Sequence, residues 1–305
     1  MLRSAILAAA DSTCIERMVS TTPLAQAVVR RFVAGVTTDN AVQVARALHA
    51  DGCNTSIDYL GEEVIDAAGV AAVTATYCQL LATLGEVDAA PFAEVSVKLS
   101  ALGQGFDPQR AAASAAMICQ TAKDVGTVVT LDAEDYASID ATLETLSVLR
   151  ADYPETGAVV QAYLRRAEAD CKDLAVAGSR VRLCKGAYGS PESVAYQRTH
   201  DVNRSFVRCL NVLLAGDGRP MIASHDATLI AIATERAYYY RRNTESFEFQ
   251  MLLGVNSKQR RDLLNAGNTV RIYLPYGTAW YRYLMRRLAE RPANLAFFLR
   301  ALARR

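Results

Sequence analysis

The stretch VRLCKGAYG at residues 181–189 places two cations where a buried strand would end. Arg182 lies within a short apolar run, and Lys185 follows that run directly. Burying a cation is costly unless an anionic or electron-rich group meets it. The stretch is therefore predicted either to bind such a ligand or to pair with carboxylates of the same protein, such as Asp132 and Glu134.

The residues that follow the run favour an anionic cofactor. Lys185 and the backbone N–H groups of Gly186 and Ala187 could hold a phosphate at the start of a helix, where the helix dipole favours negative charge. Gly186 lets the backbone approach a ligand closely. Tyr188 offers a flat face for stacking on a ring system, and Arg182 could donate to electron-rich ring atoms.

A second group of charged residues lies near the C-terminus, in the sequence YLMRRLAERPAN. A strand is expected to end at Tyr273, and a helix is expected to follow the turn after it. Arg286 and Arg287 on that helix could converge on one carboxylate, which guanidinium groups bind bidentately. Glu290 is within helical reach of both arms. A solvated helix surface is the alternative interpretation of this pattern.

The elements that must position these residues are short apolar strands alternating with longer helical stretches. Eight strands are predicted, at residues 53–59, 94–99, 127–131, 157–163, 179–183, 220–224, 246–251 and 269–274. This rhythm is typical of an α/β protein with a (β/α)₈ TIM-like barrel. The barrel is expected to span residues 49–305, after a helical segment at 1–48. A doubly wound sheet is the alternative, but LGQGF is not its glycine-rich turn.

In such barrels the chemistry takes place at the carboxyl ends of the strands. Polar or charged residues are expected at all eight of these ends, namely Asp58, Lys98, Asp132, Gln161, Arg182, His225, Gln250 and Tyr273. A barrel that served only as a scaffold would not need them. The pattern predicts an enzyme.

Composition excludes several other classes of function. The net charge is +1 and no long basic tract occurs, so no nucleic-acid binding is expected. Seven scattered cysteines indicate reduced thiols in a cytoplasmic protein. The histidines and cysteines show no metal-ligand spacing, so no metal is expected. The apolar run at the N-terminus is too short for a signal peptide, and no membrane span is predicted.

Nine sequence blocks together resemble the proline dehydrogenases, specifically the short single-activity bacterial form. In order along the chain they are SIDYLGEEV, VSVKLSALG, LDAEDY, VVQAYLRRA, VRLCKGAYG, ASHDATLI, FEFQMLLG, RIYLPYG and YLMRRLAERPAN. The resemblance covers most of the chain, from about Asn54 to Ala301. About 45 residues at the N-terminus carry no matching motif, and are expected either to cover the flank of the barrel or to mediate association into a homo-oligomer.

The resemblance implies a distorted (β/α)₈ barrel that binds FAD without a Rossmann domain. Such an enzyme oxidises L-proline to Δ1-pyrroline-5-carboxylate by hydride transfer from proline C5 to flavin N5. It then passes the electrons to a membrane quinone. The expected location is therefore the cytoplasm or the inner face of the cytoplasmic membrane, with peripheral membrane contact.

The resemblance also implies a role for each site residue. Those expected at the substrate are Arg286 and Arg287 on the proline carboxylate, Lys98 and Glu290 ordering that end of the pocket, Tyr273 and Leu252 on the pyrrolidine ring, and Asp132 nearby. Those expected at the cofactor are Arg182 beside flavin N5, Gln161 and Ala133 at the ring, Lys185, Gly186 and Ala187 at the phosphates, Tyr188 stacking, and Ser224 with His225 at the far end. The acceptor of the substrate's amine proton stays open between Asp132 and water.

Two other functions remain as alternatives at this point. Lys98 and Lys185 at barrel ends could serve a Schiff-base lyase or aldolase. A non-catalytic binding module or transcriptional regulator could also use the barrel, although the absence of a basic patch disfavours DNA binding.

Overall fold

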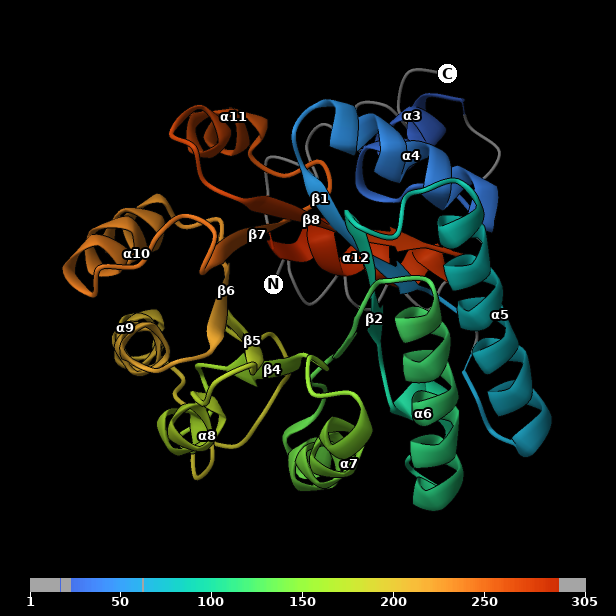
Figure 1. Cartoon of the computed structure of the whole chain (residues 1–305), viewed down its shortest axis with the longest axis horizontal. Coiled ribbons are helices and arrows are strands. Elements are labelled where there is room, and N and C mark those ends of the chain that lie inside the picture. Colours follow the sequence, from blue (N-terminus) through green and yellow to red (C-terminus); the bar gives the residue numbers. More distant parts are fainter. Residues whose placement is uncertain (1–16, 18–22, 62, 291–305) are drawn as a thin grey trace.

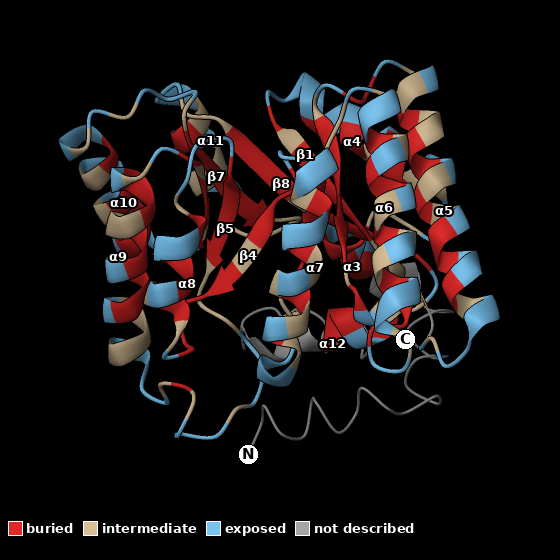
Figure 2. Cartoon of the chain, turned by 60° about the horizontal axis from the view of Figure 1, so that its bottom comes forward, coloured by how far each residue is buried: buried red, intermediate tan, exposed pale blue. Residues whose placement is uncertain are grey.

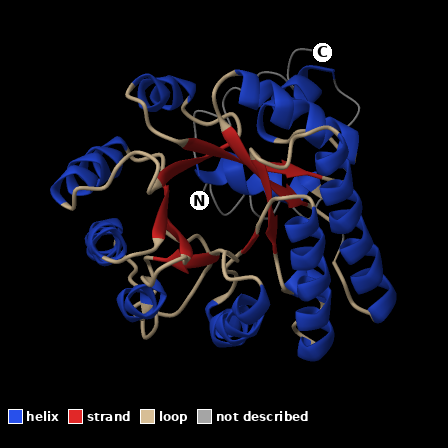
Figure 3. Cartoon of the chain, in the orientation of Figure 1, coloured by secondary structure: helices blue, strands red, loops and turns tan. Residues whose placement is uncertain are grey.

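The computed structural model describes residues 17, 23–61 and 63–290 as an α/β barrel (Figure 3). All eight predicted strands are present. They are β1 (Asn54–Tyr59), β2 (Ala93–Val97), β3 (Val129–Leu131), β4 (Ala158–Gln161), β5 (Arg180–Cys184), β6 (Arg219–Ala223), β7 (Glu248–Leu252) and β8 (Val270–Tyr276).

The eight strands form one parallel sheet in the order β3-β2-β1-β8-β7-β6-β5-β4. The two ends of that order meet at a parallel bridge between Thr130 and Gly157. The sheet therefore curls into a nearly closed barrel, as the strand rhythm predicted. A Cβ at position 157 would lie 2.6 Å from the Thr130 hydroxyl, so only glycine allows this close approach of β3 and β4.

Helices surround the strands (Figure 1). Those that follow β1 to β7 are α5 (Ala67–Glu86), α6 (Pro108–Asp124), α7 (Ile139–Asp152), α8 (Ala167–Leu174), α9 (Thr199–Ala215), α10 (Ala227–Tyr239) and α11 (Ser257–Asn265). Their buried faces and the outward side chains of the strands form the hydrophobic core. Figure 2 shows this buried layer between the strands and the exposed outer faces of the helices.

Two helices precede the barrel, α3 (Pro23–Phe32) and α4 (Thr38–Ala50). The Thr37 hydroxyl accepts from the Asn40 backbone, and the Asn40 side chain accepts from the Thr37 backbone, which completes a capping box. A non-helical connection at residues 33–37 separates the two helices within the predicted helical segment 1–48. Most of residues 1–22 lies outside the described residues.

Helix α5 has the length and apolar composition of a membrane span, with a mean hydropathy of 1.4 in its most apolar window. The prediction that no stretch of the sequence is long and apolar enough for a membrane span was therefore wrong as regards length and composition. Its large side chains, including Val73, Tyr77, Leu80 and Leu81, are buried within the hydrophobic core. The apolar residues of α5 thus have a structural role as a barrel helix.

Two predicted details of the strand ends are wrong. Strand β8 does not end at Tyr273 but continues through Pro275 to Tyr276, because it pairs with the whole of β1. Lys185 to Ala187 do not begin a helix, since residues 185–198 are irregular and α9 begins at Thr199. No helix dipole therefore acts on the loop after β5.

Candidate active site

The charged residues of the site face the barrel interior because they alternate with apolar residues along the strands. Successive strand side chains point to opposite faces of a sheet. In β5, Arg182 lies between Val181 and Leu183, which both belong to the hydrophobic core. The same two-residue step places the polar side chains of β1, β2, β3, β7 and β8 inside the barrel. Most parallel barrel strands instead carry apolar residues on both faces.

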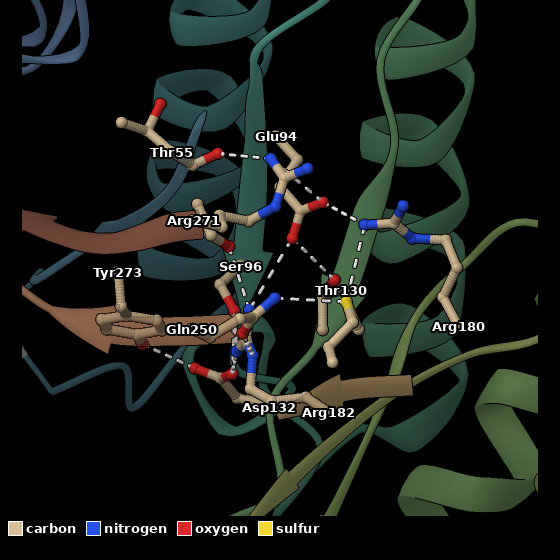
Figure 4. Close-up of polar contacts among 12 residues, drawn as sticks. Thr55, Glu94, Ser96, Thr130, Asp132, Arg180, Arg182, Gln250, Arg271 and Tyr273 are labelled. Atoms are coloured by element: carbon tan, nitrogen blue, oxygen red, sulfur yellow. Dashed lines mark hydrogen bonds and ion pairs between the residues drawn. The ribbon is translucent and has the colours of Figure 1, made fainter. Parts of the chain in front are cut away.

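Arg182 is the centre of this interior (Figure 4). Its Nη1 donates to Asp132 Oδ1 at 2.6 Å and to Ser96 Oγ at 2.8 Å. Its Nη2 donates to Ser56 Oγ at 3.0 Å, and its Nε donates to Gln250 Oε1 at 2.5 Å. The guanidinium also lies 5.2 Å from the centroid of the Tyr273 ring. A buried arginine is thus held by partners from four other strands or strand ends.

Lys98 joins two carboxylates beside this arginine. Its Nζ lies 2.6 Å from Asp58 Oδ1 and 3.4 Å from Asp132 Oδ2. It also donates to the Tyr273 hydroxyl at 3.3 Å, and that hydroxyl donates to Asp132 Oδ2 at 2.7 Å. The structure therefore brings together five of the predicted strand-end residues with Arg182, namely Asp58, Lys98, Asp132, Gln250 and Tyr273.

The pKa values of the two carboxyl groups beside Lys98, those of Asp58 and Asp132, shift in opposite directions. Burial raises the pKa of Asp58 above its ordinary value, although Lys98 opposes the shift. Burial acts the same way on Asp132, but Lys98 and Arg182 together hold its pKa below the ordinary value. Lys98 itself has a raised pKa, because Asp58 and Asp132 outweigh the effect of burial. Opposite shifts of paired acids are typical of sites that move protons.

The residues predicted at the cofactor line the mouth of the barrel after β5 and β6. Lys185 Nζ pairs with Asp226 Oδ2 at 2.8 Å. Lys185 is therefore paired with a carboxylate of the same protein, as the alternative interpretation of this stretch allowed, but that carboxylate is neither Asp132 nor Glu134. Ser224 Oγ accepts from the Asp226 backbone at 3.1 Å. His225 Nε2 accepts from the backbone N–H of Leu252 at 3.1 Å, which links the ends of β6 and β7.

The ends of β3, β4 and β5 are joined on the other side of the mouth. Gln161 donates through its amide to the Glu134 carbonyl at 2.8 Å, directly after the half-buried Ala133. Gly186 has a φ of +92°, and a Cβ there would lie 2.1 Å from the Tyr163 ring. Gly186 and Ala187 therefore turn tightly over Tyr163, while the Tyr188 side chain is 38% exposed.

The predicted carboxylate clamp lies on α12 (Trp280–Glu290), which follows β8 at the carboxyl end of the barrel. The Ala279 backbone donates to the Leu60 carbonyl at 3.0 Å, which docks the start of this helix beside the end of β1. The Arg287 guanidinium lies 5.2 Å from the centroid of the Tyr283 ring. The side chains of Arg286 and Glu290 lie outside the described residues, so their roles stay predictions.

Three buried partners of Arg182 were not predicted from the sequence to contact it. Ser56 and Ser96 both accept from Arg182, and Gln250 was recognised only as a polar residue near the end of a strand. Each lies two residues from another inward-facing polar residue. That two-residue step was the signal that could have found them.

A second layer of charges lies deeper in the barrel, towards the amino ends of the strands from Arg182 (Figure 4). Glu94 pairs with Arg180, and Glu248 Oε1 accepts from Arg271 Nε at 2.7 Å. Arg271 Nη1 also donates to the Thr55 carbonyl at 2.9 Å and lies 3.6 Å from Glu94. All four charged side chains are buried. Their pairing offsets much of the desolvation cost of placing charges inside a barrel.

Glu248 makes the stability of the protein sensitive to acid. Burial would raise its pKa, but Arg271 and Arg180 lower it to about 2. A folded-state pKa below the unfolded value stabilises the fold above pH 4.5, and that contribution is lost as the pH falls towards 2. We expect a loss of roughly 3 kcal/mol over this interval from Glu248 alone.

Urea unfolding between pH 6 and pH 2 measures this loss. Glu248→Gln should be less stable than wild type at pH 6 and should lose less stability on acidification. Equal acid sensitivity of the two proteins would show that Glu248 is not the group that titrates.

The comparisons with known proteins agree with this geometry. A family model described as proline dehydrogenase matches residues 41–300. The chain belongs to the proline dehydrogenase family. It is therefore an enzyme of this family, and the resemblance seen in the nine sequence blocks is confirmed.

Individual members of the proline dehydrogenase family match nearly the whole chain. "Proline dehydrogenase 1" of Bacillus subtilis subsp. natto is 33% identical over 278 residues, covering 90% of this chain and 91% of that protein. "Proline dehydrogenase" of Deinococcus radiodurans is 32% identical over 307 residues, covering 99% of this chain and 98% of that protein. Both have about the length of this chain, as expected for the short form.

A solved structure supports the fold. Proline utilization A from Bdellovibrio bacteriovorus, inactivated by N-propargylglycine, has a TM-score of 0.81 with 25% sequence identity. The match covers 87% of this chain but only 33% of that longer protein. The barrel described here therefore corresponds to about one third of the larger enzyme.

Proposed function

We propose that this proline dehydrogenase family member catalyses the FAD-dependent oxidation of L-proline to Δ1-pyrroline-5-carboxylate and passes the electrons to a quinone. The single observation that carries the proposal is the buried contact of Arg182 with Asp132, beside Lys98 and Tyr273, at the carboxyl end of the barrel. Family membership supplies the expected substrate and cofactor.

The residues present suit a flavin dinucleotide in charge and shape. Arg182 and Lys185 provide two cations within and directly after β5, for the electron-rich ring and the phosphates. The turn at Gly186 has a conformation that favours glycine, and the backbone of residues 186 and 187 would approach the phosphates there. Gln161, Ala133, Tyr188, Ser224 and His225 are the remaining residues that would hold the cofactor.

The bound flavin would supply the two-electron chemistry, as the hydride acceptor for proline C5. Arg182 would stabilise the negative charge that develops on reduction, because a fixed buried cation needs no reorganisation. Arg286 and Arg287 would orient the substrate through its carboxylate. Tyr273 and Leu252 would pack against its ring.

The substrate amine must also lose a proton. Asp132 is the proposed acceptor, directly or through a water, because it is an ionised carboxylate in contact with Arg182, Lys98 and Tyr273. The Tyr273 hydroxyl, which donates to Asp132 Oδ2 at 2.7 Å, and Lys98 stabilise this ionised form.

The Schiff-base alternative is disfavoured by the charges around Lys98. A Schiff-base lysine must be neutral to attack a carbonyl group. Asp58 and Asp132 raise the pKa of Lys98, which keeps it protonated. Lys185 is paired with Asp226 at 2.8 Å. The geometry of both lysines therefore suits fixed cations.

The visible spectrum of the purified protein before and after anaerobic addition of L-proline tests the proposal. We expect a non-covalently bound flavin whose absorbance band bleaches with proline. A flavin band that does not respond to proline would redirect the search to other cyclic or secondary amines. A protein that takes up no FAD would contradict the proposed cofactor.

A membrane quinone as acceptor implies peripheral contact with the inner face of the cytoplasmic membrane, and we propose this location. Reoxidation of the bleached enzyme by a soluble quinone, with and without lipid vesicles, tests the acceptor and the contact separately. Sedimentation at several protein concentrations tests the proposed homo-oligomer.

A further inference from the structure

Gln250 occupies an unusual place in the barrel interior, between the site and the deeper layer of charges. Its Oε1 accepts from Arg182 Nε at 2.5 Å, and its Nε2 donates to Glu248 Oε1 at 2.7 Å. Arg182 can only donate and an ionised Glu248 can only accept, so the two neighbours fix the amide in one orientation. Gln250 and Glu248 both lie on β7, two residues apart and facing inward.

The far end of this contact is itself rigid. Glu248 accepts from Arg271 at 2.7 Å and 3.2 Å, and lies 3.3 Å from Arg219 Nη2. Its lowered pKa keeps it ionised over the whole neutral range. Rotation of the Gln250 amide would therefore break its hydrogen bond to Glu248 and remove one partner from a buried carboxylate.

The near end of this contact completes the environment of Arg182. The other donors of the guanidinium point to Asp132, Ser96 and Ser56, and its Nη2 lies 3.7 Å from Glu94. Gln250 is the partner of Nε. Because the Nε–H bond lies in the plane of the guanidinium, the hydrogen bond to Gln250 helps to fix that plane.

We propose that Gln250, anchored by Glu248, is a positioning residue that holds the Arg182 guanidinium in place and so sets how strongly its charge stabilises the reduced flavin. This inference rests on the proposed function, because it assigns Gln250 a role towards the same cofactor. Gln250 itself lies one side chain away from the reacting groups.

Gln250→Met tests the role, since Met has a similar length but removes both amide hydrogen bonds. We expect the equilibrium constant for flavin reduction to fall by tenfold or more. For a two-electron couple, a tenfold fall makes the midpoint potential about 30 mV more negative. Flavin reduction by proline should slow by tenfold or more, at an unchanged half-saturating proline concentration. An unchanged potential and rate would overturn the proposal, whatever the melting temperature.

Two further variants separate positioning from mere stability. Thr74→Val is the matched control, because it removes a buried hydrogen bond to the Val70 carbonyl at 2.8 Å within α5, outside the group of charges around Arg182, and it should leave the potential unchanged. Gln250→Glu should restore much of the lost potential, since two carboxyls this close share one proton and the introduced group can still bridge Arg182 and Glu248. A Gln250→Glu potential as negative as that of Gln250→Met would contradict the bridge.

The midpoint potential is measured by dye titration in the absence of proline. It therefore tests Gln250 even if proline is not the reductant, and a wild-type flavin that ignores proline would count only against the proposed substrate. Wild-type protein without flavin would overturn the proposed function and this inference together. If Gln250→Met does not fold, Gln250→Asn gives the same readout, because its shorter amide cannot reach both partners.

Discussion

Replacing Arg182 with methionine is expected to slow flavin reduction by proline by about 100-fold to 1000-fold. The reason is the loss of the guanidinium at the centre of the site, which contacts Asp132 and Ser96. The same change removes a partner from a buried carboxylate, so the free energy of unfolding should fall by about 3–5 kcal/mol. Anaerobic stopped-flow absorbance and urea unfolding measure the two effects.

Arg180→Met is the matched control for this prediction. Arg180 is a buried arginine of the same strand, but it pairs with Glu94 in the deeper layer of charges. We expect it to lower stability to a similar extent while flavin reduction stays close to the wild-type rate. If both variants reduced the flavin equally fast, Arg182 would have no special part in the reaction.

Replacing either arginine of the clamp is expected to weaken proline binding while the flavin stays bound. Losing one charged hydrogen-bond partner costs about 2–4 kcal/mol, which corresponds to a roughly 30-fold to 1000-fold higher dissociation constant. Arg286→Met and Arg287→Met should each show this shift in the proline dependence of flavin bleaching. The limiting rate should change less than the half-saturating concentration, because the clamp binds a part of the substrate that does not react.

Arg282→Met on the same helix provides the comparison for the clamp. Arg282 is exposed on α12, four residues before Arg286. Its replacement should leave the proline dependence unchanged. Unaltered saturation in both clamp variants would instead return the Arg-Arg pair to the alternative of a solvated helix surface.

Much of the architecture could be predicted from local patterns. The apolar runs identified all eight strands. The strand ends were less accurate, because β8 continues past Tyr273 where pairing with β1 extends it. The prediction of a helix start at Lys185 was also wrong. That helix was inferred from the expected phosphate site and not from a helical pattern of apolar residues after it.

The sequence by itself determined which residues line the interior of the barrel. The two-residue step of a strand places polar side chains of β1, β2, β3, β5, β7 and β8 on one face and apolar ones on the other, and this step is a local property of the chain. The nine blocks, read in order, were also sufficient for the family. The family was recognised without the three-dimensional structure, whereas Ser56 and Ser96 were recognised as interior residues only in the structure, although the same two-residue step places them there.

The pairing of those interior charges was decided only by the tertiary structure. Arg182 meets Asp132 across 50 residues and Gln250 across 68, and Arg180 meets Glu94 across 86. In a closed barrel, the strand register and the opposing walls decide which inward side chains lie at the same level. The sequence alone does not show which inward side chains lie at the same height in the barrel. It therefore predicted carboxylates such as Asp132 and Glu134 as possible partners of both cations. The structure pairs Arg182 with Asp132 and Lys185 with Asp226.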